Sequence, residues 1–173
     1  MVSLALRRAL LCVAALTMLT ACQLDTEEEA RRLVAPWVFL AETEVFHSEA
    51  NCTVARFATI SPDVRRSKGP VLVEGVRESI PFLEEKQVVA YALPGLSPNQ
   101  ISEQLMSINL FKGLGLLSSF VSPGKNCMDE TFASDAFQVL MSPDTTLIYD
   151  PVNYALVLLY RPLNKAFLVR TKS

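Results

Sequence analysis

The chain has 173 residues, half of them apolar, with 16 basic side chains, 18 acidic side chains and one histidine. Its formal charge of −2 gives no support for nucleic acid as a partner, because protein surfaces that bind nucleic acid are typically basic. The length suits one domain with its own core and would be cramped for two.

The first 22 residues contain the parts of an export signal. Arg7 and Arg8 precede an apolar run from Ala9 to Ala21, and small residues lead into Cys22. The 13 residues of this run fall well short of the roughly 20 that a permanent membrane span requires. We therefore expect the segment to be cleaved.

The stretch Leu19-Thr20-Ala21-Cys22 resembles the lipobox of bacterial lipoproteins, and the resemblance covers about the first 23 residues. It implies a thioether-linked diacylglycerol on Cys22, cleavage before this residue and acylation of the new amino group, with palmitate as the typical acyl chain. Two or three chains at about 0.8 kcal/mol per buried methylene would give a stable attachment. The alternatives are an ordinary secretory signal in which Cys22 is incidental, a non-cleaved anchor, and export by the twin-arginine route.

This resemblance divides the chain into a signal peptide at 1–21, a lipidated tether at 22–25 and a single domain at 26–173. Cleavage removes only Arg7 and Arg8 among the charged residues, so 14 basic residues would remain against 18 acidic ones, a charge of −4. In well-studied diderm bacteria an aspartate after the lipidated cysteine retains the protein at the inner membrane. Gln23 stands there, which implies the periplasmic face of the outer membrane, with the inner membrane as the alternative.

Two cysteines remain for the mature domain, since Cys12 lies in the signal and Cys22 would carry lipid. In an oxidising periplasm we predict that Cys52 and Cys127 form a disulfide, worth roughly 4 kcal/mol in the chain-entropy model. A reactive thiol pair and a metal site are the alternatives. One histidine supplies too few ligands for a zinc site, so we predict neither metal nor cofactor.

The first half of the domain is predicted as a helix followed by a hairpin. Thr26 and Glu29 form a capping box for a helix that ends near Ala35, and the apolar block 37–40 should dock it on the core. A basic surface connection is expected at 61–70. The other elements expected in this half are strands at 41–48, 52–59, 71–73 and 87–92 and a short helix over 76–83.

The second half is predicted as two helices and a meander. Ser97, Pro98 and Gln100 begin a helix that ends near Gly113, and the apolar stretch 113–120 is either helical or a packed loop. Asn126 is expected to cap a second helix that Cys127 opens. Three apolar runs at 145–149, 154–160 and 166–170 indicate antiparallel strands, and the middle run should be covered on both faces.

Together these patterns predict an α+β domain. The sheet should be twisted and mainly antiparallel, with five or six strands, three or four helices packed on it and the β-meander at the C-terminus.

No residue pattern indicates a catalytic site. His47 is the only histidine that a Ser–His site could use, and 115–119 lacks the glycine that the hydrolase motif requires after serine. The glycines of 113–115 lack the third glycine of a dinucleotide fingerprint and suggest close helix packing. Adjacent acids at 84–85 and 129–130 diverge on a helix. Met106, Phe111 and Phe120 could line an acyl pocket, although such stripes are usually core.

We therefore expect a non-enzymatic binding or envelope-assembly module, held at a membrane through Cys22, with an envelope protein as partner and no nucleic acid. One alternative is a small envelope hydrolase acting on wall or lipid substrates, which needs a pocket at His47 with a serine or carboxylate in reach. The other is a lipid carrier, which needs an enclosed apolar cavity.

Overall fold

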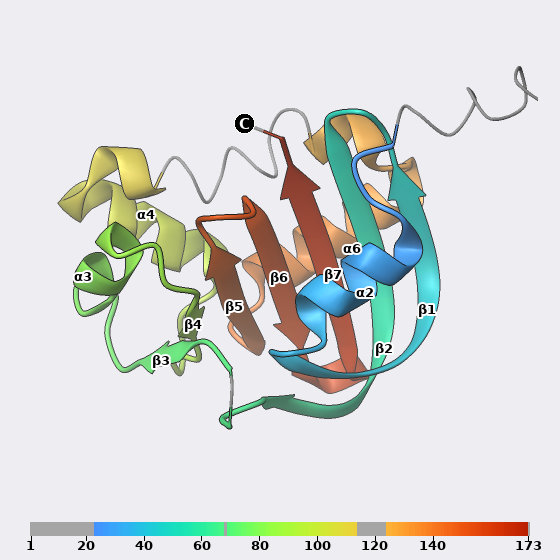
Figure 1. Ribbon diagram of the computed structural model, residues 1–173. Coiled ribbons are helices and arrows are strands. Elements are labelled where there is room, and N and C mark those ends of the chain that lie inside the picture. The colour runs from blue at the N-terminus through green and yellow to red at the C-terminus, as the bar shows by residue number, and fades with distance from the viewer. Residues whose placement is uncertain (1–22, 68, 114–123, 173) are drawn as a thin grey trace, which may run out of the picture.

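The computed structural model of the chain describes residues 23–67, 69–113 and 124–172. The predicted signal peptide, Cys22 and most of the apolar stretch 113–120, including Phe120, lie outside the described residues. Within them the fold is α+β, and one mixed sheet carries helices on both faces (Figure 1). The sheet has seven strands, where the sequence predicted five or six.

The elements follow one another along the chain without internal repetition. The strands are β1 (Val38–Ser48), β2 (Cys52–Val64), β3 (Val71–Val73), β4 (Val89–Tyr91), β5 (Thr145–Asp150), β6 (Ala155–Tyr160) and β7 (Lys165–Thr171). The α-helices are α2 (Glu27–Val34), α3 (Ser79–Glu84), α4 (Pro98–Ile108) and α6 (Glu130–Met141), and the short 3₁₀ helices are η2 (Gly124–Cys127) and η3 (Arg161–Leu163). The order across the sheet is β1-β2-β7-β6-β5-β4-β3.

The predicted C-terminal meander is confirmed, and it forms the centre of the sheet. Leu156 and Leu158 of β6 belong to the core on one face, while Val157 and Leu159 belong to the core on the other. All four side chains are at most 2% exposed, as expected for a strand without polar alternation. Residues of α3, α4 and α6 pack in the first core, and residues of α2 in the second.

Helix α2 and the hairpin that follows it confirm the expected order but not all the boundaries. The capping box between Thr26 and Glu29 is present, and Ala30 and Val34 are buried. Strand β1 begins at Val38, inside the block predicted to dock the helix, and β2 continues to Val64. The last residues of β2 lie beyond the end of β7, so Pro62 removes no donor from that ladder.

Two further predictions about local order were wrong. Helix α6 is capped by Asp129, whose carboxylate accepts a 2.7 Å hydrogen bond from the Phe132 amide; Asn126 and Cys127 lie in the separate turn η2. Helix α4 has the expected cap at Ser97 but ends at Ile108, before Gly113. Strands β3 and β4 are parallel, because α3 returns the chain to the same end of the sheet.

A network of charged side chains joins β1 and β2, the two strands at one edge of the sheet, to β7 and α6. Arg56 on β2 lies 2.8 Å from the Glu44 carboxylate on β1 and 2.6 Å from Asp135 on α6. Lys165 on β7 lies 2.9 Å from the same Glu44 carboxylate oxygen. Burial raises the pKa of Glu44, but hydrogen bonds and charge from Lys165 and Arg56 outweigh it and hold the pKa below its ordinary value of 4.5.

We predict that Glu44→Gln lowers the free energy of unfolding at pH 7 by about 0.5–1.5 kcal/mol, because it removes the charge that Arg56 and Lys165 share. The depressed pKa means that this contribution is present above pH 4.5 and is lost as the pH falls through the folded-state pKa. Urea unfolding of both proteins between pH 2.5 and 7 measures it. Glu42→Gln on the same strand is the control, and a difference that persists unchanged at pH 2.5 would contradict the charge explanation.

Candidate functional site

The strand directions divide the molecule into two ends. The pairs Ser48↔Thr53, Cys52↔Thr171 and Asp150↔Ala155 lie at one end of the sheet, which we call the tether end. The pairs Val38↔Val64, Ala58↔Lys165 and Thr145↔Tyr160 lie at the other, which we call the groove end. Figure 1 shows the C-terminus and the β1–β2 turn together at the tether end, with the last residues of β2 at the groove end.

At the tether end, the first described residues are fixed to the folded body. The Leu24 amide donates a 2.7 Å hydrogen bond to the Glu49 carbonyl, and the Asp25 amide donates one of 3.1 Å to Ser48 Oγ. The Asp25 carboxylate, 5% exposed, pairs with the Arg170 guanidinium on β7. Breaking such a buried pair would leave an uncompensated charge, so residues 24 and 25 of the predicted tether are firmly held.

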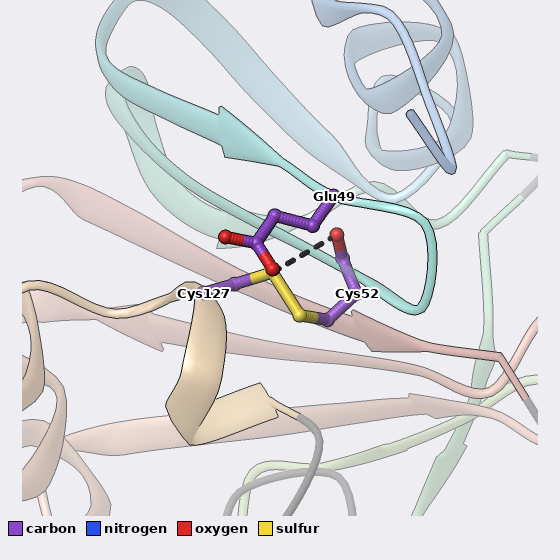
Figure 2. Close-up of side chains that lie close together, drawn as sticks. All are labelled: Glu49, Cys52 and Cys127. Atoms are coloured by element: carbon purple, nitrogen blue, oxygen red, sulfur yellow. Dashed lines mark hydrogen bonds between the residues drawn. A yellow bond between two sulfur atoms is a disulfide. The ribbon is translucent and has the colours of Figure 1, made fainter. Parts of the chain in front are cut away.

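The predicted disulfide between Cys52 and Cys127 is present at the same end. Figure 2 shows it joining the first residue of β2 to η2, with Cα atoms 6.1 Å apart. The dashed line marks a 3.1 Å separation between Cys127 Sγ and the Cys52 carbonyl oxygen. A sulfur in a disulfide has no proton to donate, so this is a close packing contact and not a hydrogen bond.

Glu49 lies beside this disulfide, and ligand atoms of Glu49, Cys52 and Cys127 lie within 4.8 Å of one another. The grouping has the residue types of a metal site. Metal binding needs thiolates, and both sulfurs are consumed in the disulfide. The arrangement is therefore a structural bridge with an exposed carboxylate beside it.

His47 lies near the disulfide and pairs with Glu49, with 3.3 Å between Nε2 and Oε1 and both side chains about half exposed. It contributes to a small cleft of about 270 Å³ whose other described lining residues include Asn126, Met128 and Asp129. Ser48 points away from it, because successive strand residues face opposite sides, and its Oγ contacts Thr53. The cleft thus offers a carboxylate and an imidazole, and its described lining has no hydroxyl nucleophile.

Two buried tyrosines lie in the core that α3 and α4 cover. Burial raises the pKa of Tyr91 to about 12 and that of Tyr149 to about 12. Both phenols therefore stay protonated at neutral pH and cannot act as bases. The Tyr91 hydroxyl has no hydrogen-bond partner among the described residues, which makes it a cost in stability.

Of the residues suggested for an acyl pocket, only Met106 and Phe111 lie in the part of the chain that the structure describes. Phe111 is 85% exposed, and Phe120 lies outside the described residues. Gly113 packs so closely on α4 that a Cβ there would overlap Met106, which agrees with the packing interpretation of this glycine. The two pairs of adjacent acids lie on different helices: Glu84 and Glu85 are exposed at the end of α3, and Asp129 caps α6.

At the groove end, three arginines that the sequence analysis did not single out line one groove. Its volume is about 730 Å³, and its lining combines Arg65, Arg66 and Arg161 with apolar side chains including Phe39, Val64 and Leu72. Arg65 and Arg66 belong to the segment predicted as a basic connection, whereas Arg161 starts η3, almost a hundred residues later. The basic pair was visible in the sequence, but its meeting with Arg161 depends on strand order.

The comparisons with known proteins identify no relative: no family model, no curated protein and no solved structure matches the chain. Among the described residues, no helix is both long and apolar enough to cross a membrane.

We predict that replacing both bridge cysteines, Cys52→Ala with Cys127→Ala, lowers the free energy of unfolding by about 2–4 kcal/mol, because the unfolded chain loses a cross-link spanning 75 residues. Urea unfolding measures the change, and reducing the wild-type protein should reproduce most of it. Non-reducing peptide mapping is the direct check. Two free thiols in the purified native protein would contradict the bridge.

Proposed function

We propose that the chain is a lipid-anchored, non-enzymatic binding module of the bacterial envelope. One observation carries the proposal: the folded body begins at Leu24 and Asp25, two and three residues after the lipobox cysteine. A lipid on Cys22 would hold the tether end close to the bilayer, because the linker between them is very short. The disulfide supports the same assignment, since such bridges persist in oxidising compartments.

The position at the outer membrane remains part of this proposal and rests on Gln23, which follows the lipobox cysteine. In this arrangement the strands run away from the membrane, and the arginine groove faces the periplasmic space. The ladder between β2 and β7, from Cys52↔Thr171 to Ala58↔Lys165, spans roughly 20 Å along the strands, which separates the groove from the lipid headgroups. The module would therefore present its groove to periplasmic ligands.

We predict that Cys22→Ala abolishes incorporation of radiolabelled palmitate and releases the protein from the membrane fraction, because no other residue would carry the lipid. Labelling of whole cells followed by immunoprecipitation measures the incorporation. Cys12→Ala, which changes a cysteine within the predicted signal, should label normally. Normal labelling of the Cys22→Ala protein would disprove the lipoprotein assignment.

A second candidate, an envelope hydrolase, is favoured by the 3.3 Å pair of His47 and Glu49 and by the cleft beside it. A histidine held by a carboxylate can serve as a general base toward water. Against this candidate, both side chains are about half exposed, so bulk water screens the pair.

The binding-module proposal predicts that His47→Ala leaves any cellular phenotype of the protein unchanged, because the half-exposed histidine lies at the tether end and does not line the arginine groove. Complementation of a deletion strain with the variant tests it. Glu49→Ala is the companion variant, and Glu42→Ala on the exposed edge strand is the control. Loss of complementation by both His47→Ala and Glu49→Ala at normal protein levels would favour the hydrolase.

A further inference from the structure

We propose that the groove lined by Arg65, Arg66 and Arg161 binds a small ligand that carries a phosphate or carboxylate group on a compact apolar body. The inference rests on the proposed binding function and names the class of ligand. The groove volume of about 730 Å³ lies within the usual range of small-molecule sites.

The charge of the groove is the first argument. Among the described residues, its lining includes three arginines and one acid, Asp63, an excess of two positive charges in a chain that is acidic overall. Asp63 faces its own neighbour, since its carboxylate accepts a 3.4 Å hydrogen bond from Ser61 Oγ. An anion entering the groove would therefore meet a positive potential, although the chain as a whole is acidic.

The guanidinium groups of the groove lack the carboxylate partners that other arginines of the molecule have. Arg56 and Arg170 each lie beside carboxylates. In the part of the chain that the structure describes, none of the three groove arginines has a carboxylate within 4.0 Å. Guanidinium forks match carboxylate and phosphate oxygens, so the groove holds unused capacity for such groups.

Arg65 is also held in position before any ligand arrives. Its guanidinium lies 4.3 Å from the centre of the Phe39 ring, and its Nη1 donates a 3.1 Å hydrogen bond to the Ala35 carbonyl. Its backbone amide donates to the Trp37 carbonyl at 2.8 Å. Fixing this side chain in the free protein reduces the ordering cost of binding.

The apolar wall determines the second half of the ligand. Phe39 and Val64 of the hairpin face the groove together with Leu72 of edge strand β3, whose side chain is 46% exposed. An inorganic anion would use only the arginines, whereas an anion on an aromatic or branched body would also cover this wall. The groove lies at the end opposite Leu24 and Asp25, so we assign it a diffusible anion and not a headgroup of the anchoring membrane.

The test uses the full chain as purified from its membrane in a neutral detergent. Isothermal titration compares phenyl phosphate and benzoate with inorganic phosphate and benzyl alcohol, which carry only the charge or only the apolar body. We expect saturable binding of phenyl phosphate, benzoate or both, weakened by added salt, and at least tenfold weaker binding of the other two.

The variants locate the site. Arg66→Gln with Arg161→Gln should weaken binding at least tenfold, and both residues are exposed, so the fold should be retained. Arg32→Gln with Arg77→Gln removes the same charge outside the groove and should leave affinity unchanged. Saturable binding of only phenyl phosphate, or of only benzoate, would support the proposal and identify the anionic group that the groove prefers. No saturable binding by either aromatic anion, equal binding of benzyl alcohol, or an equal effect of the two double variants would overturn it.

Failure here is distinguishable from failure of the proposed anchoring. Normal palmitate labelling of Cys22 without anion binding would leave the lipoprotein and remove the groove ligand. Anion binding without labelling would do the reverse.

Discussion

The antiparallel pairing of β2 with β7 is the interaction on which the rest of the structure depends. It joins the N-terminal hairpin to the C-terminal strand over seven residue pairs, from Cys52↔Thr171 to Ala58↔Lys165. Two ion pairs reinforce the attachment to β7: the Glu44 carboxylate reaches Lys165 across β2, and the Asp25 carboxylate reaches Arg170. Without this pairing the hairpin would be an isolated two-stranded ribbon, which is only marginally stable in water.

The pairing of β2 with β7 explains why hydrogen bonds, an ion pair and a disulfide all occur at the tether end. The hairpin contributes Ser48 and Thr53, which are buried and share a 2.9 Å hydrogen bond, and the Asp25 amide donates to the same serine. The disulfide then ties Cys52 to η2, on the side of the sheet that α6 covers. Residues 24 and 25 therefore cannot detach without exposing a buried carboxylate and its partner. A pull applied just before them would be resisted by the hairpin and by β7 together.

Sequence reasoning succeeded where the deciding interactions are local. Thr26 and Ser97 cap their helices through residues three positions along, and the unbroken apolar run of β6 indicated burial on both faces. It failed where distant segments decide. The parallel pairing of β3 with β4 depends on where α3 returns the chain, and the start of α6 at Glu130, after its cap Asp129, depends on the turn that carries Cys127 to Cys52. The disulfide was predictable from the number of cysteines and from the compartment that the sequence led us to expect, but the arginine groove was not, because Arg66 and Arg161 lie 95 positions apart.

The curl of the first hairpin connects the two ends of the molecule. Register shifts between Val38 and Val45 mark bulges in the β1–β2 pairing, and bulges bend strands and increase their twist. The end of β2 runs past the lower end of the sheet toward β3, as Figure 1 shows. Arg65 and Arg66, which follow β2 directly, line one groove together with Leu72 and Arg161. The same strand that begins at the disulfide thus ends at the groove. The largest shift lies between the pairs Val38↔Val64 and Leu40↔Thr59, where β2 runs through more residues than β1, so the groove depends on this irregular segment of β2 as well as on its own side chains.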